Sequence, residues 1–168
     1  LGVGSRFIVE LPLSAGQGIE RPRERRQAPR LPPLRILAAD DVAQNLELLV
    51  LNLERLGHQV ATVADGEAAV ERFTREPFDL VLMDVQMPGT DGLEASRRIR
   101  AWEQREQRVP VPIIALTASV LDRDRQDALD AGMNGFASKP LEMSALVAEM
   151  AGVLGLAATV QAAPTSSD

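Results

Sequence analysis

Five polar residues stand directly after short apolar segments of the chain, where side chains able to do chemistry are uncommon. Three are the carboxylates of Asp40, Asp41 and Asp84, one is the hydroxyl of Thr117, and one is the ammonium of Lys139. Lys139 is the single lysine among 18 basic residues. If the chain brings these groups together, it builds an acidic cluster with one cation and one hydroxyl beside it.

Such a cluster predicts phosphoryl chemistry supported by a hard metal ion. Carboxylates that lie close together repel one another unless a cation separates them. Oxygen ligands suit Mg²⁺, and with no cysteine in the chain a thiolate metal site is excluded. Asp84 could then stay ionised and attack phosphorus, while Lys139 and Thr117 contact the phosphoryl oxygens. His58 is expected at the start of a strand, at the wrong end, as a surface or strand residue rather than a phosphate carrier.

These residues need a scaffold that brings distant parts of the chain to one edge, and the apolar pattern predicts one. Each of five short apolar segments is followed by a helical pattern, the weakest over residues 120–131. Strands that are apolar on both faces and alternate with helices indicate a doubly wound α/β fold with a parallel sheet. Ligands bind such sheets beyond the carboxyl ends of the strands, where the five polar residues stand. The expected strands are 35–39, 59–63, 80–83, 112–116 and 135–138.

Some of the acidic residues have a purely local interpretation as helix caps. Asp91 precedes a helical pattern with Glu94 three residues later, which favours a capping box. A turn or cap role is also favoured for Asp65. For Asp41, which stands three residues before Gln44, capping and metal binding are both open.

Composition divides the chain into an acidic body and a basic N-terminal part. The net charge is −6, but residues 1–33 carry an excess of arginine, so residues 34–155 are strongly acidic. An acidic body argues against nucleic-acid binding. No apolar run approaches the length of a membrane span, so no membrane contact is expected of this segment. We expect a strand at 1–13, a linker at 14–33, the main domain at 34–155 and a flexible tail at 156–168.

Four sequence blocks resemble the signatures of the response-regulator receiver domain of two-component signalling. They are ILAADD, LVLMDVQMPGTDG, IIALTAS and GFASKP, in that order. The resemblance covers about residues 34–155. It implies a flavodoxin-like sheet of five parallel strands in the order 2-1-3-4-5, with five helices.

The resemblance also implies roles around the acidic cluster. Asp84 is the phosphoacceptor, which receives a phosphoryl group from a phosphohistidine. Asp40, Asp41 and Asp84 hold Mg²⁺, together with the backbone carbonyl of Gln86. Gln86 and Ser119 tune the lifetime of the phosphoaspartate.

Further residues form the switch that the resemblance implies. Thr117 is the switch hydroxyl, and Lys139 pairs with the phosphoryl group. The peptide bond from Lys139 to Pro140 is cis. Ala118 is small and leaves phosphorus accessible. The aromatic switch position is Phe136, which has no hydroxyl, so only packing can move it.

Residues 1–13 resemble the last strands of the ATP-binding domain of a sensor histidine kinase. The resemblance implies that the parent protein is a hybrid kinase with this receiver in the cytoplasm, and it leaves open whether the parent is membrane-anchored. The segment has no nucleotide-binding boxes and no phosphoacceptor-histidine helix of its own. Its expected partner is therefore a histidine-kinase core or a histidine phosphotransfer protein.

Two other functions compete with the phosphoacceptor. A receiver-like docking module would share the fold without being phosphorylated, although the complete set of polar residues argues against it. A phosphatase of the haloacid-dehalogenase kind also uses an aspartate nucleophile. It needs a general-acid aspartate two residues later, where this chain has Gln86.

Overall fold

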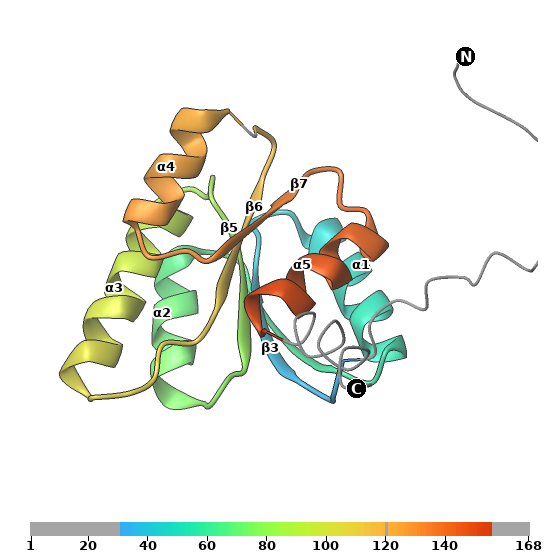
Figure 1. Cartoon of the computed structure of the whole chain (residues 1–168), viewed down its shortest axis with the longest axis horizontal. Coiled ribbons are helices and arrows are strands. Elements are labelled where there is room, and N and C mark those ends of the chain that lie inside the picture. The colour runs from blue at the N-terminus through green and yellow to red at the C-terminus, as the bar shows by residue number, and fades with distance from the viewer. Residues whose placement is uncertain (1–30, 120, 156–168) are drawn as a thin grey trace, which may run out of the picture.

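The computed structural model describes residues 31–119 and 121–155, which form one α/β unit (Figure 1). The strand predicted at 1–13, most of the linker at 14–33 and the tail at 156–168 lie outside the described residues. Strands and helices alternate along the described chain. Their bounds are β3 (Arg35–Ala39), α1 (Ala43–Arg55), β4 (Gln59–Val63), α2 (Gly66–Arg75), β5 (Leu80–Asp84), α3 (Gly92–Arg105), β6 (Ile113–Thr117), α4 (Asp122–Asp130), β7 (Gly135–Ser138) and α5 (Met143–Val153).

The strands form a five-stranded sheet in the order β4-β3-β5-β6-β7. Every neighbouring pair is parallel. In chain order this is 2-1-3-4-5, so the predicted fold is confirmed. The central strand β5 is buried along its whole length, as its continuous apolar run predicts.

Two apolar layers cover the two faces of the sheet. One layer joins alternate strand residues such as Leu37 to buried side chains of α2, α3 and α4. The other joins the intervening residues such as Ile36 to buried side chains of α1 and α5. Figure 1 shows the same division, with α2, α3 and α4 on one side of the sheet and α1 and α5 on the other.

The winding direction of the chain reverses between β3 and β5, which lie side by side in the sheet. Ala39 pairs with Met83 near the ends of these strands. Asp40 follows the first strand and Asp84 ends the other, so both carboxylates reach the same edge. This is the edge at which open α/β sheets bind their ligands.

Close packing at the start of α3 fixes the end of β5. A Cβ atom at Gly92 would lie 2.1 Å from the backbone carbonyl oxygen of Asp84. The helix can approach this strand end only because residue 92 has no side chain. Asp91 caps the same helix by accepting the backbone N–H of Glu94 at 2.8 Å, as predicted.

The cap predicted at Asp65 is confirmed, and of the two roles left open for Asp41, capping is excluded. Asp65 accepts the backbone N–H of Ala68 at 2.7 Å and so caps α2. Asp41 does not cap α1, because the N-cap residue is Val42 and no side chain bonds the helix end there. The N–H of Val42 is itself bound by Asp40, whose Oδ1 accepts it at 2.8 Å.

His58, expected as a surface or strand residue and not as a phosphate carrier, lies directly before β4 and away from the surface. It is buried, and its Nδ1 accepts the backbone N–H of Leu34 at 3.1 Å, between the start of β3 and the turn before β4. It stands at the opposite end of these strands from Asp40, so it takes no part in the acidic cluster. None of the helices described here is long and apolar enough to cross a membrane.

Candidate functional site

Three carboxylates meet at the carboxyl ends of β3 and β5. Asp40 is fully buried and Asp84 is 3% exposed, whereas Asp41 is open to solvent. One oxygen atom from each lies within 4.8 Å of the other two. The structure thus brings together three aspartates that were predicted from two separate segments.

Lys139 joins this cluster from the end of β7, two strands away from β5. Its Nζ lies 2.9 Å from Oδ2 of Asp84 and 3.1 Å from Oδ2 of Asp40. The peptide bond from Lys139 to Pro140 is cis, as the family resemblance implies. One ammonium group therefore bridges the two buried carboxylates.

Neutral donors hold the same carboxylates in place. Asp84 accepts the backbone N–H of Gln86 at 3.1 Å on Oδ1, the oxygen that does not contact Lys139. Asn45 donates from Nδ2 to Oδ2 of Asp40 at 3.1 Å. The pattern of polar residues at strand ends does not include Asn45, although its place in the first turn of α1, five residues after Asp40, could have suggested it.

The environment raises the pKa of Asp84. Burial is the largest cause, because it disfavours the charged carboxylate. Hydrogen bonds from Lys139 and Gln86 work in the opposite direction, and the nearby charge of Asp40 adds to the rise. The charge of Asp84 is therefore only partly compensated in this arrangement.

The pKa of Lys139 is raised as well. Burial alone would lower it, but the hydrogen bonds and charges of Asp84 and Asp40 together outweigh burial. Lys139 is thus protonated at neutral pH and carries the positive charge of the site.

The hydroxyl of Thr117, at the end of β6, is engaged within its own loop. It donates to the backbone carbonyl of Ser119 at 2.8 Å and accepts the backbone N–H of Ser119 at 3.1 Å. Ala118 between them is exposed. In this arrangement Thr117 must exchange a partner before it can donate to anything bound at Asp84.

Phe136 of β7, the strand next to that of Thr117, is partly buried. Both residues line a small cavity of about 40 Å³, together with Gln86 and Ser119. Cζ of Arg125 in α4 stands 5.3 Å from the centroid of the Phe136 ring. The predicted switch residues therefore surround one cavity behind the acidic cluster.

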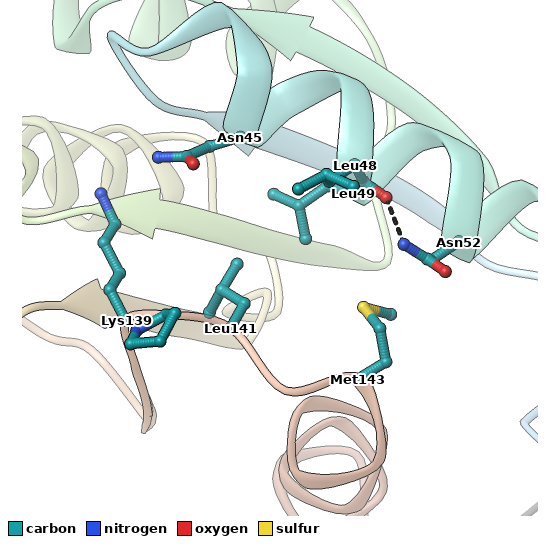
Figure 2. Close-up of a pocket in the computed structure, with 8 residues that line it drawn as sticks. Asn45, Leu48, Leu49, Asn52, Lys139, Leu141 and Met143 are labelled. Carbon is teal, nitrogen blue, oxygen red and sulfur yellow. Dashed lines mark hydrogen bonds between the residues drawn. The ribbon is translucent and has the colours of Figure 1, made fainter.

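An apolar groove of about 470 Å³ opens beside Lys139, between α1 and the connection from β7 to α5 (Figure 2). Leu48 and Leu49 of α1 form one wall, and Leu141 and Met143 form the other. Leu48 is largely exposed. An apolar surface thus adjoins the charged site directly.

The donor set of the acidic cluster is compatible with a metal site. It consists of carboxylate oxygens only, which suit hard divalent cations. A cation here would relieve the repulsion between Asp40 and Asp84 that Lys139 relieves in part. Asp41 is the solvent-exposed member of the cluster, so a cation that arrives from solvent can reach its carboxylate first.

Comparison with known proteins shows the family of this chain. The model of the response regulator receiver domain matches residues 36–151. The sensor protein GacS of Pseudomonas syringae pv. syringae is 44% identical over 115 residues, which are 66% of this chain and 13% of that protein. The chain therefore spans about one eighth of the length of this curated relative.

Two solved structures of similar fold come from signalling proteins. The receiver domain of the sensor histidine kinase PA1611 from Pseudomonas aeruginosa has a TM-score of 0.65 and 39% identity, covering 74% of this chain and 99% of that one. That structure holds a magnesium ion in its active-site cleft. The receiver domain of Ssk1 from Saccharomyces cerevisiae, solved with the histidine phosphotransfer protein Ypd1, has a TM-score of 0.69 and 29% identity, covering 71% of this chain and 88% of that one. With the family model matching most of the chain, this protein belongs to the response regulator receiver domain family.

Proposed function

We propose that this receiver accepts a phosphoryl group from a phosphohistidine onto Asp84 and relays it in a two-component phosphorelay. The observation that carries the proposal is the bonding of Asp84, which is buried and held by Lys139 at 2.9 Å and by the N–H of Gln86 at 3.1 Å. In the transfer, an Asp84 oxygen forms a bond to phosphorus while the phosphorus–nitrogen bond breaks. The electron pair of that bond returns to the imidazole of the donor.

Magnesium is the metal that we propose for the cluster. Asp40, Asp41 and Asp84 would hold it with the backbone carbonyl of Gln86. The all-oxygen donor set supports this assignment, as does the magnesium ion in the PA1611 receiver. The ion supplies charge neutralisation for the carboxylates and for the incoming phosphoryl oxygens.

The remaining polar residues complete the proposed site. Lys139 neutralises a phosphoryl oxygen, since its ammonium already contacts Asp84. Thr117 releases the carbonyl of Ser119 and donates its hydroxyl to the phosphoryl group, and Phe136 then turns into the space behind it. Gln86 and Ser119 flank the path of water to phosphorus and set the lifetime of the phosphoaspartate.

A helix that carries a phosphohistidine is the partner that we propose for the apolar groove. The groove adjoins Lys139, so an apolar helix lying against Leu48 and Met143 brings its histidine toward Asp84. The complex of Ypd1 with the Ssk1 receiver is consistent with a histidine phosphotransfer partner. The histidine-kinase core of the same parent chain is the alternative donor of the phosphoryl group.

The parent protein that we propose is a hybrid sensor kinase, with this receiver in the cytoplasm where ATP is available. The likeness to GacS supports this parent. Residues 1–13 would then be the end of the kinase ATP-binding domain, followed by a linker, the receiver at 34–155 and a tail.

The test is labelling with phosphoramidate, a small phosphodonor, in the presence of Mg²⁺. We expect the wild-type chain to be labelled and the Asp84→Asn variant not to be. Asp127→Asn, a change at an exposed aspartate of α4, is the matched control and should label normally. Labelling that persists in Asp84→Asn removes Asp84 from its role, and a wild-type chain that binds no Mg²⁺ and takes no label favours the docking module.

A further inference from the structure

The loop that joins β5 to α3, residues 85–91, contacts the acidic cluster through its backbone. The N–H of Gln86 donates to Oδ1 of Asp84 at 3.1 Å, and the carbonyl of the same residue is the backbone ligand proposed for magnesium. The two ends of the loop are tied to each other, because the N–H of Gly92 donates to the carbonyl of Val85 at 3.0 Å. The position of this loop therefore decides how Gln86 meets Asp84.

The first turn of α2 packs against the far side of this loop. Gly66, the first residue of the helix, is buried. A Cβ atom at Gly66 would overlap the backbone carbonyl oxygen of Thr90 and would lie 3.0 Å from its Cγ2. The next residue, Glu67, accepts the hydroxyl of Thr90 at 3.4 Å. The helix can therefore lie this close to the loop only because residue 66 has no side chain.

Glycine is needed at position 66 for space and not for its backbone conformation. Gly66 is not among the glycines with a positive φ. Alanine stabilises an open helical position relative to glycine, so the helix by itself would favour Gly66→Ala. The close approach of Thr90 is what an added methyl group would disturb.

The helix itself is held firmly and cannot easily withdraw from the loop. Ala69 is fully buried and Phe73 is 4% exposed, in the same apolar layer as Met83 of β5. Asp65 caps the helix by accepting the backbone N–H of Ala68 at 2.7 Å. A shift of α2 would open this close-packed layer, so a methyl group at position 66 displaces the loop instead.

A displacement of the loop at Thr90 reaches Gln86. Only four residues separate the two positions, and the ends of the loop are bonded to each other. The shift is therefore shared among the few peptide groups between them. A metal ligand binds best when its supporting contacts hold it in place before the ion arrives, so a displaced Gln86 weakens the metal site.

We propose that Gly66 is a positioning residue of the phosphoacceptor site, which lets α2 hold the loop in the place where Gln86 meets Asp84. The inference rests on the magnesium site proposed above, to which it adds a residue of α2. Changes to the groups that support metal ligands lower metal affinity by about 10- to 100-fold. Gly66 acts through several peptide groups, so we expect the lower end of this range.

The experiment measures the dissociation constant of Mg²⁺ by calorimetry. In Gly66→Ala we expect binding to be about tenfold weaker than in the wild-type chain. The matched control is Gly152→Ala, because a Cβ atom at this glycine of α5 meets nothing within 4 Å; its affinity should not change. In ¹H–¹⁵N spectra without metal, the amide signal of Gln86 should shift in Gly66→Ala but not in Gly152→Ala.

A second pair of variants loosens the same turn without adding an atom. Asp65→Ala removes the cap of α2, whereas Asp65→Asn makes the same change of charge and keeps an oxygen that can cap the helix. We expect Mg²⁺ to bind Asp65→Ala at least about twofold more weakly than Asp65→Asn. This pair decides the question if urea unfolding shows that Gly66→Ala does not fold.

The possible results separate this inference from the proposed function. Equal Mg²⁺ affinities of folded Gly66→Ala and Gly152→Ala, or an unshifted amide signal of Gln86, would overturn the role of Gly66. Equal affinities of Asp65→Ala and Asp65→Asn would do the same. A wild-type chain that binds no Mg²⁺, or undiminished binding in Asp84→Asn, would instead overturn the metal site proposed at Asp84.

Discussion

Replacing Asp84 by asparagine is expected to stabilise the magnesium-free protein at neutral pH, although it removes an ion pair. The carboxylate is nearly buried and its pKa is raised, chiefly by burial. Its charge is therefore unfavourable in the folded state. Asparagine keeps an oxygen that can accept the N–H of Gln86, and Lys139 keeps its contact with Asp40.

The size of the effect follows from the distances in the site. At an effective dielectric constant of about 20, Lys139 at 2.9 Å attracts the Asp84 carboxylate by roughly 6 kcal/mol. Asp40, with an oxygen within 4.8 Å, repels it by at least about 3.5 kcal/mol. The exposed Asp41 adds a smaller repulsion, screened by water. The net attraction of about 2 kcal/mol is smaller than the burial penalty of the Asp84 charge, which is several kcal/mol. Because Asp84→Asn removes both, it should raise the free energy of unfolding by about 1–2 kcal/mol.

The pH dependence gives this prediction a second signature. A carboxyl group whose pKa is higher in the folded than in the unfolded chain binds its proton more tightly when folded. The wild-type protein therefore loses stability as the pH rises from about 4 through the raised value. The advantage of the variant should be largest near pH 7 and should vanish at acid pH, where Asp84 is protonated in both states.

Urea unfolding followed by the fluorescence of Trp102, the single tryptophan, measures both signatures. The experiment compares wild type, Asp84→Asn and the control Asp127→Asn in EDTA, from pH 4 to 8. Added Mg²⁺ should stabilise the wild type more than Asp84→Asn and so close the gap. A variant no more stable than wild type at pH 7, or a gap independent of pH, would refute the reasoning.

Three further outcomes follow from other contacts. Lys139→Met should retain Mg²⁺ binding but slow the labelling of Asp84 by phosphoramidate by roughly tenfold or more; an unchanged rate would contradict its role. Glu103→Ala should lower the free energy of unfolding in urea by about 2–3 kcal/mol, because this carboxylate is 2% exposed and accepts the backbone N–H of Val111 at 2.8 Å. A loss no greater than that caused by Glu106→Ala, a change at an exposed glutamate, would argue otherwise. Burial lowers the pKa of His58, so the folded chain binds fewer protons at His58 than the unfolded chain does. The free energy of unfolding, measured in urea, should therefore fall as the pH drops below about 6.5. The same fall in His58→Asn would exclude this histidine as its cause.

The sheet and the acidic cluster could be predicted because both depend on simple regularities. Strands that are apolar on both faces need cover on both sides, which calls for alternating helices and a parallel sheet. The carboxyl ends of parallel strands meet at one edge. Asp40 and Lys139 follow such strands and Asp84 ends one, so their convergence follows from the pattern.

Other features depend on tertiary contacts that no local pattern carries. Asn45, Arg125 and Glu149 are polar residues on helices, and nothing in their spacing says that they contact Asp40, the ring of Phe136 and the backbone N–H of Phe136. The sequence leaves capping open for Asp41, and the structure places the N-cap of α1 at Val42 instead. His58 is buried where its Nδ1 accepts the backbone N–H of Leu34, 24 residues earlier, a contact that no local pattern shows.

The most direct test of the account is to locate the phosphoryl group on the chain. The wild-type protein, treated with phosphoramidate and Mg²⁺, is reduced with borohydride, which converts a phosphoaspartate to homoserine, and its peptides are analysed by mass spectrometry. The account predicts homoserine at position 84 alone, and none when EDTA replaces Mg²⁺. Modification at another aspartate, or an equal yield at Asp84 without a divalent cation, would contradict it.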